Sequence, residues 1–389
     1  MSERTAIVVG AGIAGLATAG GLARTGWKVT LLERADRLRP GRAAVQIWPN
    51  GVRALESLGL AEALESVATP MPQLGVRRPD GRILHPTDDT VPRPVLVHRA
   101  DLHDVFMSGL GDQVEIRTGF AVRTVGPTSQ RPSVGDGATT CSADLVVGAD
   151  GTDSMLRRRL APAATLVSAG YARWRAVIPW FRAPNLSGEL APGAESFGDG
   201  HRFTFTALGT PGTSRGGLYW AAAVPGAARP EPPETQLALL RRWFAGWHAP
   251  IGDLLAATHP EDLVQETVRE LRPLPAFAHA AEHGGYALAG DAAHAMSAHA
   301  GQGAGLALED AAVLQHVLRG AVQGSIGDAL EEYARVRAAR ITRFAAHSRK
   351  LDAALQARGR FSVSGRFAPR LLDRVALAGA EWVAPGPRP

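Results

Sequence analysis

The chain opens with an apolar run at residues 6–9, followed by a glycine-rich turn and a helical pattern. A short run that is apolar throughout is typical of a strand buried on both faces of a parallel sheet. The helix is expected to reach about Arg24 and to end at Gly26, because glycine is common just after a helix. A second apolar strand at residues 29–32 ends on Glu33. The pattern therefore predicts a strand–helix–strand unit.

Two adjacent glycines, Gly20 and Gly21, lie inside this helix. Glycine costs about 1 kcal/mol relative to alanine in a helix interior. We therefore expect the helix to pack closely against a neighbouring element at this point.

Further along the chain the pattern changes to short apolar runs separated by Gly and Pro. Residues 75–78 and 82–85 flank an Asp-Gly pair and are expected to form two antiparallel strands. Further runs at residues 174–180, 201–207 and 217–224 indicate antiparallel strands of a second domain.

Two other buried strands lead into acidic residues. Residues 144–149 are followed by Asp150, and residues 285–290 are followed by Asp291. In open α/β folds ligands bind at the carboxyl ends of the strands, so both carboxylates are candidate ligand groups. For Asp150 the alternative is a structural role as the cap of the next helix.

These patterns predict an α/β protein with a Rossmann-like nucleotide-binding domain, a mostly antiparallel β-sheet substrate domain and C-terminal helices. The long Arg-rich helix from Ile326 to about Gln356 is assigned to packing and a solvated face. We expect the nucleotide-binding domain to comprise residues 1–73, 99–170 and 271–325, the substrate domain residues 74–98 and 171–270, and the helical segment residues 326–389.

Composition is that of an ordinary globular protein, with 45% apolar and 20% charged residues in a chain of 389. The net charge of +5 is spread along the chain and carried almost wholly by Arg, since Lys28 and Lys350 are the only lysines. No nucleic-acid partner is therefore expected. The single Cys141 excludes an internal disulfide and a Cys-pair metal site, and no metal is expected. The chain enters a strand at once and has no apolar run of about 18 residues, so we expect a cytoplasmic protein without a membrane span.

The N-terminal unit carries the dinucleotide-binding fingerprint Gly10-x-Gly12-x-x-Gly15. Gly10 permits the tight turn, Gly12 lets a pyrophosphate approach the backbone, and Gly15 lets the helix lie close to the strand. Glu33 follows at the distance at which an acid accepts a hydrogen bond from a ribose hydroxyl. A lone glycine motif also suits an ordinary turn, but here strand, glycines, helix, strand and acid occur in order.

Two further loops are candidates for function. Residues 301–305 form a Gly-rich turn before a helix, where free N–H groups and the helix dipole favour an anion or an electron-rich carbonyl. Residues 42–49 are too irregular for a clean strand or helix and carry an Arg, a Gln and a Trp. That composition suits either a functional loop or an ordinary connector.

Three motifs stand together in order: the glycine fingerprint with Glu33, residues 144–151 with Arg157, and residues 290–294. With this set the chain resembles the single-component FAD-dependent aromatic hydroxylases, the para-hydroxybenzoate hydroxylase class. The stretches PNGVRALESLGL, VHRADL, YARWRAVIP, GHRFTF and LYW resemble its salicylate-hydroxylase and zeaxanthin-epoxidase-like branch. The resemblance covers residues 5 to about 345. Relatives often carry Pro at the positions of Ala295 or Ala298, so the shape of that loop stays open.

The resemblance implies FAD as cofactor. The glycines would hold the pyrophosphate, Asp291 the ribityl chain, and residues 301–305 would lie near the isoalloxazine ring. Arg42, Gln46 and Arg99 would contact the pyrophosphate or ribityl groups. The full set of expected cofactor-binding residues is Gly10, Gly12, Ala14, Gly15, Glu33, Arg34, Arg42, Gln46, Arg99, Asp150, Gly151, Gly290, Asp291, Gly301, Gly303 and Ala304.

The resemblance also implies a monooxygenase that uses O2 and NADPH or NADH as a transient co-substrate. Reduced flavin would form a C4a-hydroperoxide, which a closed apolar pocket protects from water, and an aromatic or polycyclic phenolic substrate would be hydroxylated. A base would help by ionising the phenol. His201, Tyr219 and His299 are the candidates, although a buried structural role is the competing interpretation for each histidine. A monomer or a homodimer is expected.

Other flavin proteins share this type of fold. Flavin-dependent halogenation needs an active-site lysine, and no Lys occurs between Lys28 and Lys350. Two-domain Baeyer–Villiger enzymes are disfavoured because a second glycine fingerprint is missing. An epoxidase, an oxidative-rearrangement enzyme, a reductase and, from a different class, a non-catalytic flavin-binding protein stay as alternatives.

Overall fold

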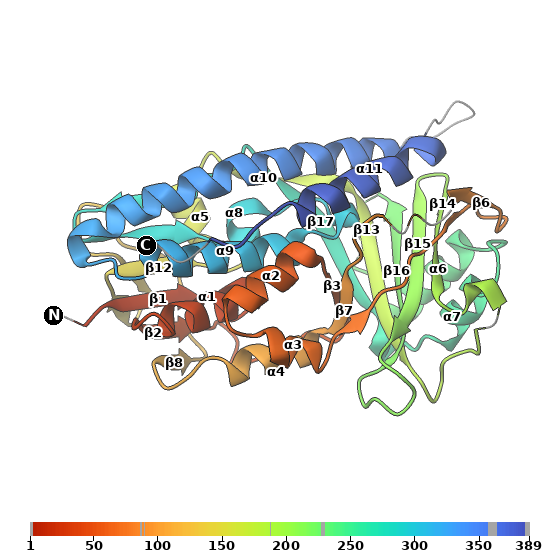
Figure 1. Cartoon of the computed structure of the whole chain (residues 1–389), viewed down its shortest axis with the longest axis horizontal. Helices are drawn as coiled ribbons and strands as arrows, with labels where there is room; N and C mark the ends of the chain where they lie inside the picture. Colours follow the sequence, from red (N-terminus) through yellow and green to blue (C-terminus); the bar gives the residue numbers. More distant parts are fainter. Residues whose placement is uncertain are drawn as a thin grey trace.

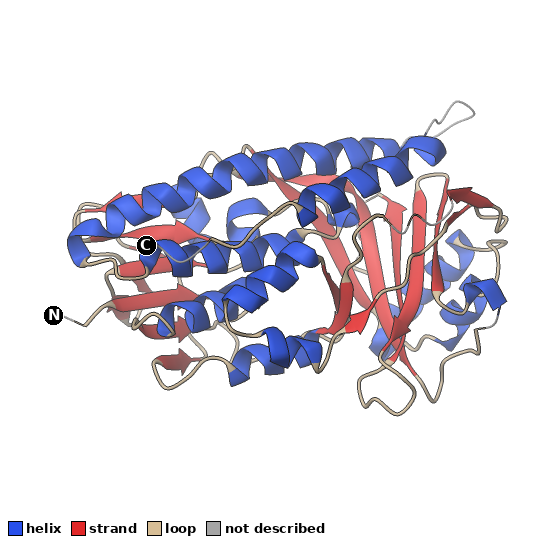
Figure 2. Ribbon diagram, viewed as in Figure 1, coloured by secondary structure: helices blue, strands red, loops and turns tan. Residues whose placement is uncertain are grey.

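The computed structural model has two large β-sheets and a long helix that runs past both (Figure 1). The structure describes residues 3–85, 88, 90–186, 188–226, 230–356 and 364–385. Residues 357–363 and 386–389 of the expected C-terminal helical segment lie outside the described residues. Helices pack around both sheets (Figure 2), so the expected α/β class is confirmed.

The N-terminal strand–helix–strand unit lies at the centre of a six-stranded sheet with the order β18-β19-β12-β1-β2-β8. The pair β18–β19 is antiparallel and the other pairs are parallel. Its strands are β1 (Thr5–Val9), β2 (Lys28–Leu32), β8 (Val114–Arg117), β12 (Leu145–Gly148), β18 (Ala278–Ala281) and β19 (Gly284–Leu288). Because β12 and β19 are parallel to β1, the acidic residues that follow them reach the same sheet edge as the glycine loop.

The second sheet has seven strands in the order β17-β13-β16-β15-β14-β5-β6, antiparallel except for the pair β5–β14. Its strands are β5 (Val76–Arg77), β6 (Ile83–His85), β13 (Thr165–Pro179), β14 (Gly193–Gly198), β15 (His201–Leu208), β16 (Gly217–Pro225) and β17 (Val264–Arg272). Helices α6 (Pro233–Trp243) and α7 (Ile251–Ala257) cover the face that faces away from the first sheet (Figure 1). Phe203 and Phe205 belong to the core between this sheet and the two helices.

Two three-stranded sheets complete the β-structure. One joins β3 (Ala44–Ile47), β7 (Val95–His98) and β4 (Thr69–Pro70); the other joins β9 (Thr124–Val125), β10 (Ser133–Gly135) and β11 (Thr140–Ser142). The expectation of an irregular segment at residues 42–49 is wrong, because Ala44–Ile47 pairs with the distant strand Val95–His98. Local sequence does not reveal a strand whose hydrogen-bond partners lie so far along the chain.

The remaining helices lie mainly around the first sheet (Figure 2). They are α1 (Ile13–Ala23), α2 (Pro49–Ser57), α3 (Ala61–Glu65), α4 (Arg99–Ser108), α5 (Met155–Leu160), α8 (Asp291–His294), α9 (Gly303–Leu318), α10 (Ile326–Gln356) and α11 (Ser364–Ala380). Short 3-10 turns occupy Gly188–Leu190, Pro260–Asp262, Ala298–Ala300 and Gln323–Ser325.

Helix α1 packs against α2 and α9 without a gap at Gly21. A Cβ on Gly21 would lie 2.8 Å from Leu58 Cδ2 and 3.8 Å from the carbonyl oxygen of Ala311. The close packing expected from the glycine pair is therefore confirmed at Gly21. At Gly20 the nearest atom would be the carbonyl oxygen of Gly109, 3.4 Å away, which is an ordinary contact.

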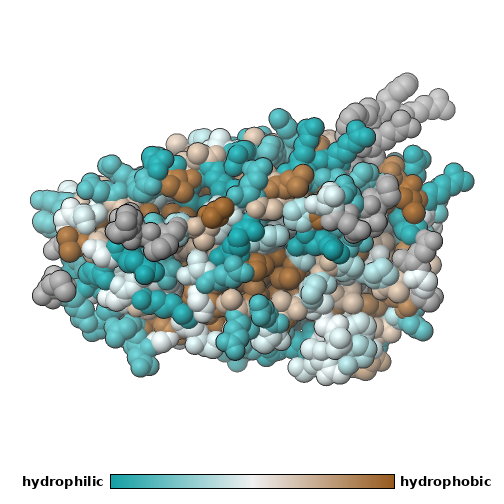
Figure 3. All heavy atoms as spheres, viewed as in Figure 1, coloured by the Kyte–Doolittle hydropathy of each residue, from teal (hydrophilic) through white to brown (hydrophobic). Residues whose placement is uncertain are grey.

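The surface is mainly hydrophilic along α10, and hydrophobic residues gather near the middle of the face shown in Figure 3. Among the described residues, the structure contains no helix that combines the length and apolar character needed to span a membrane.

Candidate active site

The glycine loop has the geometry that its sequence predicts. Gly10 adopts a φ of +100°, and a Cβ there would lie 2.5 Å from the carbonyl oxygen of Ala149. A Cβ on Gly15 would lie 1.7 Å from the carbonyl oxygen of Gly10. A Cβ on Gly12 would meet no described atom within 4 Å. The fold itself therefore needs Gly10 and Gly15, whereas Gly12 faces open space.

A cavity of about 360 Å³, here called the Glu33 cavity, opens beside this loop. The expected residues that line it are Gly10, Gly12, Glu33, Arg34, Asp150 and Gly151. The Glu33 carboxylate accepts hydrogen bonds from the N–H groups of Ala11 at 3.0 Å and Ala35 at 2.9 Å. Glu33 thus also fixes the glycine loop, a task that the sequence did not indicate.

Asp150 has one of the two roles that the sequence left open, that of a helix cap, and it uses only one carboxylate oxygen for it. Its Oδ2 accepts a hydrogen bond from the N–H of Met155 at 2.6 Å, so Asp150 caps the first turn of α5. Its Oδ1 is buried and has no hydrogen-bond partner among the described residues. An unsatisfied buried carboxylate oxygen is costly, so a ligand that donates a hydrogen bond in the Glu33 cavity would satisfy it.

A second cavity of about 350 Å³, the Asp291 cavity, shares Gly12, Ala149 and Gly151 with the first. It opens at the N-terminus of α9, where backbone N–H groups lack helical partners. The expected residues that line it are Gly12, Ala14, Gln46, Arg99, Gly151, Gly290, Asp291, Gly301, Gly303 and Ala304.

The turn that carries Asp291 is anchored by a buried charge cluster around Asp310. Oδ2 of Asp310 accepts a hydrogen bond from the N–H of Gly290 at 2.8 Å and lies 2.7 Å from His294 Nε2. Arg337 Nε donates to Oδ1 of Asp310 at 2.6 Å. Burial by itself would raise the pKa of Asp310, but His294 and Arg337 outweigh it and lower that pKa. The ionised Asp310 therefore holds the turn in place.

Arg157 ties the two acidic turns together. Its guanidinium donates to the carbonyl oxygens of Thr152 at 2.6 Å and Ala292 at 3.1 Å, and the residue is buried. The carboxylate of Asp291 accepts a hydrogen bond from Thr152 Oγ1 at 3.3 Å and is otherwise exposed to the cavity. The two turns thus form one unit along the sheet edge.

Three charged residues of the Asp291 cavity were missed by the sequence analysis: Arg173, Arg175 and Glu266. The buried Arg175 contacts the Glu266 carboxylate and donates to the carbonyl oxygen of Ala44 at 3.1 Å. Burial by itself would raise the pKa of Glu266, but Arg175 and Arg173 lower it. The signal was present in β13, where two arginines occupy alternate positions of an apolar strand and so point to one face of the sheet.

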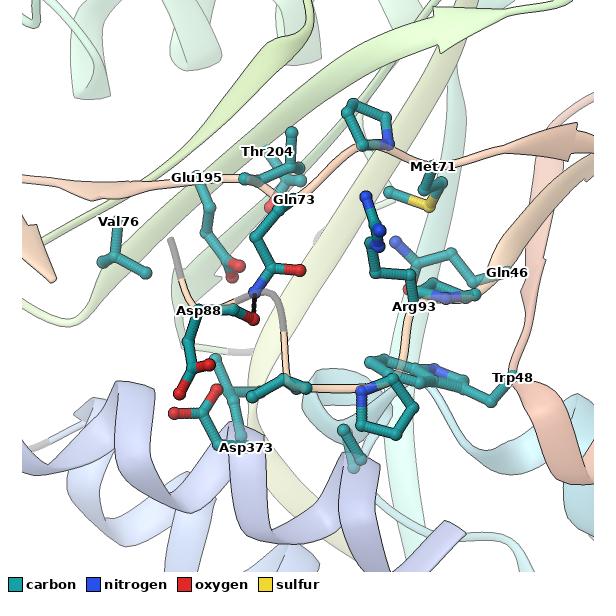
Figure 4. Close-up of a pocket in the computed structure, with 18 of the residues that line it drawn as sticks. Gln46, Trp48, Met71, Gln73, Val76, Asp88, Arg93, Glu195, Thr204 and Asp373 are labelled. Atoms are coloured by element: carbon teal, nitrogen blue, oxygen red, sulfur yellow. Dashed lines mark hydrogen bonds between the residues drawn. The ribbon is translucent and has the colours of Figure 1, made fainter. Parts of the chain in front are cut away.

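A third cavity of about 110 Å³, the Trp48 cavity, shares Gln46 with the Asp291 cavity. Figure 4 shows Trp48, Met71 and Gln46 on one side of it. The carboxylates of Asp88, Glu195 and Asp373 lie on the other side. Asp373 comes from α11, so the C-terminal helix closes this cavity.

Arg202 borders the Trp48 cavity and was also missed by the sequence analysis. Its guanidinium lies 2.5 Å from the Glu195 carboxylate and donates to the carbonyl oxygen of His299 at 2.7 Å. Alternation along β15 directs Arg202 and Thr204 to this cavity. The alternation of residues along β15 could therefore have identified Arg202 as a residue of this cavity.

The structure brings two of the three expected bases to the cavities. His299 is buried and lines the Trp48 cavity, and its Nδ1 lies 3.3 Å from Arg202 Nη1. Burial lowers the pKa of His299 well below its usual value, and the charges of Arg202 and Arg173 add to this effect. Tyr219 lines a small adjoining cavity, and its hydroxyl accepts from Arg173 at 3.4 Å.

His201 does not fit the expected role of a base. Its ring packs edge-on against Phe244 with centroids 5.8 Å apart, in the layer between the sheet and α6. The neighbouring Arg202 faces the Trp48 cavity instead, because successive strand residues point to opposite faces. His201 therefore lines none of the cavities described here.

Two expected cofactor residues line neither of the larger cavities. Gly15 lies behind the glycine loop, where it allows close packing. Arg42 is exposed and donates to the carbonyl oxygen of Glu261, in the turn Pro260–Asp262, at 2.9 Å.

The two larger cavities fit an FAD molecule. A Cβ on Gly12, Gly151 or Gly303 would meet no described atom within 4 Å, so the backbone is open to a ligand at each of these positions. The unsatisfied oxygen of Asp150 and the N-terminus of α9 add a hydrogen-bond acceptor and an anion-binding site.

Comparison with known proteins agrees with this fit. The family described as FAD binding domain matches residues 3–348. The FAD-dependent urate hydroxylase of Klebsiella pneumoniae is 31% identical over 361 residues, covering 89% of this chain and 88% of that protein. The 6-hydroxynicotinate 3-monooxygenase of Pseudomonas fluorescens is 29% identical over 332 residues, covering 80% of this chain and 82% of that protein.

A solved structure extends the likeness to the whole fold. The crystal structure of Klebsiella pneumoniae HpxO with FAD and uric acid matches with a TM-score of 0.82 and 27% identity, over 97% of this chain and 96% of that one. The chain therefore belongs to the FAD binding domain family and is an FAD-dependent monooxygenase of the aromatic hydroxylase type, as its motifs predicted.

Proposed function

We propose that this enzyme hydroxylates a small planar aromatic or phenolic molecule bound in the Trp48 cavity, with FAD in the Glu33 and Asp291 cavities. The observation that carries the proposal is the position of Gln46, which borders both the Asp291 cavity and the Trp48 cavity. A substrate ring beside Gln46 would therefore lie next to the flavin ring. The volume of about 110 Å³ favours a compact ring system over a large polycyclic one.

For the cofactor we propose the following contacts. The loop around Gly12 holds the pyrophosphate, and Glu33 holds the adenosine ribose. Asp291 binds the ribityl chain, and the N-terminus of α9, from Gly303, lies at the isoalloxazine ring. These roles are supported by the residues that line each cavity and by the open backbone at both glycines.

When bound, FAD would take two electrons from NAD(P)H and use them to activate O2, of which one oxygen atom would go to the substrate ring and the other to water. The protein binds and orients the ring and keeps water from it. Trp48 and Met71 form one apolar wall, and Arg202, paired with Glu195, holds His299 through its Nδ1 and its carbonyl oxygen. Exclusion of water from the site limits wasteful reaction with water.

His299 acts in this scheme as a hydrogen-bond donor rather than a base. Its lowered pKa keeps the ring neutral at physiological pH, because burial and the charge of Arg202 oppose protonation. Since Arg202 donates toward Nδ1, the ring proton is assigned to Nε2. An Nε2–H group beside a phenolate or carbonyl oxygen of the substrate would stabilise the negative charge that activates the ring.

We further propose that residues 1–73, 99–170 and 271–325 form the FAD-binding domain and that residues 74–98 and 171–270 form the substrate domain. All strands of the six-stranded sheet fall in the first set of ranges, and the strands β5, β6 and β14–β16 fall in the second. NAD(P)H then docks transiently, because the chain has one glycine fingerprint.

The test is oxidation of NADH and NADPH by the FAD-loaded enzyme with a panel of ring compounds: salicylate, 4-hydroxybenzoate, 6-hydroxynicotinate, urate and naphthols. We expect at least one compound to accelerate oxidation and to gain one oxygen atom by mass spectrometry. Arg202→Gln should abolish the acceleration, whereas Lys28→Ala, at an exposed residue, should not. Enzyme whose flavin is reduced normally but which oxidises none of these ring compounds would refute the proposed substrate class.

A further inference from the structure

The loop that carries His299 is held by a chain of hydrogen bonds that begins outside the cavities, on α10. Oδ1 of Asp352 accepts a hydrogen bond from Ser297 Oγ. Ser297 Oγ lies 2.9 Å from the hydroxyl of Tyr171 on β13, and that hydroxyl accepts from the N–H of Ala298 at 2.8 Å. Asp352, Ser297 and Tyr171 are all buried. Helix α10 and strand β13 thus both hold this loop.

The chain of hydrogen bonds ends where the two ligand cavities meet. Ser297 and Ala298 line the Asp291 cavity, and His299 lines the Trp48 cavity. The His299 ring stacks on the Tyr171 ring with centroids 4.0 Å apart and planes 22° apart. A change at Ser297 or Tyr171 would therefore alter the position of His299 and of the part of the loop that lines the Asp291 cavity.

The direction of these hydrogen bonds depends on the charge of Asp352. When Asp352 is ionised, the Tyr171 hydroxyl can donate to Ser297 and Ser297 can donate to the carboxylate, so that every proton has an acceptor. When Asp352 is protonated on Oδ1, the oxygen that faces Ser297, it donates to Ser297, and Ser297 then donates to Tyr171, which already accepts from Ala298. The Tyr171 proton then loses its acceptor in the chain, and an unsatisfied buried donor is costly.

We propose that Asp352 is a positioning residue for His299, and that its ionised form, through Ser297 and Tyr171, holds the loop 297–299 in its working arrangement beside the substrate and the flavin. The role goes beyond the proposed function and rests on it for the positions of the flavin and of the substrate ring.

The surroundings of Asp352 bring its titration into the physiological range. The pKa of Asp352 is raised to about 7: burial raises it, the Ser297 hydrogen bond lowers it, and the charge of Glu270 on β17 raises it. Arg272 on β17 and Arg202 on β15 act in the opposite direction. Protonation of Asp352 as the pH falls below about 7 should therefore loosen the loop.

The test compares wild type, Asp352→Asn, Ser297→Ala and, as control, Asp328→Asn, which makes the same change at an exposed position of α10. Each protein is loaded with FAD, and the rate of flavin reduction by NADH and NADPH is measured without oxygen between about pH 5 and 9. This readout needs no aromatic substrate. For any ring compound oxidised by wild type, the pH dependence of kcat and of KM is measured as well.

We expect all four proteins to bind FAD. Wild type and Asp328→Asn should show an inflection near pH 7 with slower reduction on the acid side, and Asp352→Asn should lose the inflection. Ser297→Ala should lose it too, because the link to Tyr171 is cut. An inflection that persists in Asp352→Asn, or that is missing in wild type, would overturn the proposal. A wild-type enzyme that shows the expected inflection but hydroxylates no ring compound would instead refute only the proposed function.

Discussion

Gly12 and Gly15 belong to one motif but have different roles. Gly15 is required by the protein, since a side chain there would overlap the carbonyl oxygen of Gly10. Gly12 faces open space and is required only if a ligand comes close to the backbone. Substitutions at these two positions therefore distinguish what folding requires from what cofactor binding requires.

Gly12→Ala and Gly15→Ala should therefore behave differently. We expect Gly12→Ala to leave the thermal unfolding of the FAD-free protein unchanged and to weaken FAD binding at least tenfold, because its methyl group would occupy the pyrophosphate position. Gly15→Ala should unfold the domain or lower its melting temperature strongly. Fluorescence titration with FAD and calorimetry of the FAD-free protein measure the two effects. Equal FAD affinity in wild type and Gly12→Ala would contradict the assigned position of the cofactor.

The buried, neutral His299 makes stability depend on pH. Its pKa in the folded protein lies well below the value of about 6.5 in the unfolded chain, so the unfolded state binds more protons. Stability contributed by this difference is complete above about pH 6.5 and is lost as the pH falls below it, by up to about 1.4 kcal/mol per pH unit. His299→Gln should reduce this slope between about pH 5 and 6.5 in denaturant unfolding experiments, whereas exposed His283→Gln should not. Identical slopes for wild type and His299→Gln would disprove a neutral buried ring.

At the residue scale, the sequence indicates the residues that line the Glu33 and Asp291 cavities better than those that line the Trp48 cavity. Gly12, Asp150 and Asp291 follow strands whose carboxyl ends must meet at one sheet edge, so their convergence can be inferred. Arg202 and His201 are neighbours on one strand, and only the packing of α6 on the sheet decides which of them faces the cavity. That decision depends on contacts between distant parts of the chain.

At the scale of elements, α9 and α10 use buried charges to hold the edge of the first sheet that borders the Asp291 cavity. Asp310 and Glu309 on α9 pair with Arg337 on α10, and Glu309 also pairs with Arg340. The same Asp310 carboxylate accepts from Gly290, so the helix pair determines the position of the turn that carries Asp291. The sequence predicted α10 as a long helix with a packed and a solvated face; Arg337 and Arg340 lie on its buried side.

Removing one charge from this cluster should cost far more than removing an exposed one. Asp310→Asn leaves Arg337 buried with an incomplete partner, and breaking a buried pair typically costs about 3–5 kcal/mol. We expect a loss of that order in the free energy of unfolding, together with weaker FAD binding. Glu332→Gln, in the exposed pair with Arg335 on the same helix, should change stability little. Chemical denaturation with and without FAD checks both; similar losses in the two variants would contradict the anchoring role of Asp310.

At the scale of the whole molecule, the two sheets place the Asp291 cavity and the Trp48 cavity on either side of Gln46. The first sheet and α9 surround the larger cavities, and the second sheet, residues 71–76 and α11 surround the Trp48 cavity. The two-part architecture follows from the sequence, because buried parallel strands and Gly- and Pro-separated antiparallel strands have distinct patterns. The closure of the Trp48 cavity by α11 does not follow from it, since an amphipathic helix does not reveal which surface it covers.

The central claim is that FAD in the two larger cavities oxygenates an aromatic ring in the Trp48 cavity. The most direct measurement is turnover of the FAD-loaded enzyme with NADH or NADPH and isotopically labelled O2, in the presence of the ring compound that most accelerates NAD(P)H oxidation. We predict a product that carries one labelled oxygen atom on the ring, and loss of this product in Arg202→Gln with the flavin still bound. Labelled hydrogen peroxide as the sole oxygen product, or oxygen derived from water, would contradict the account.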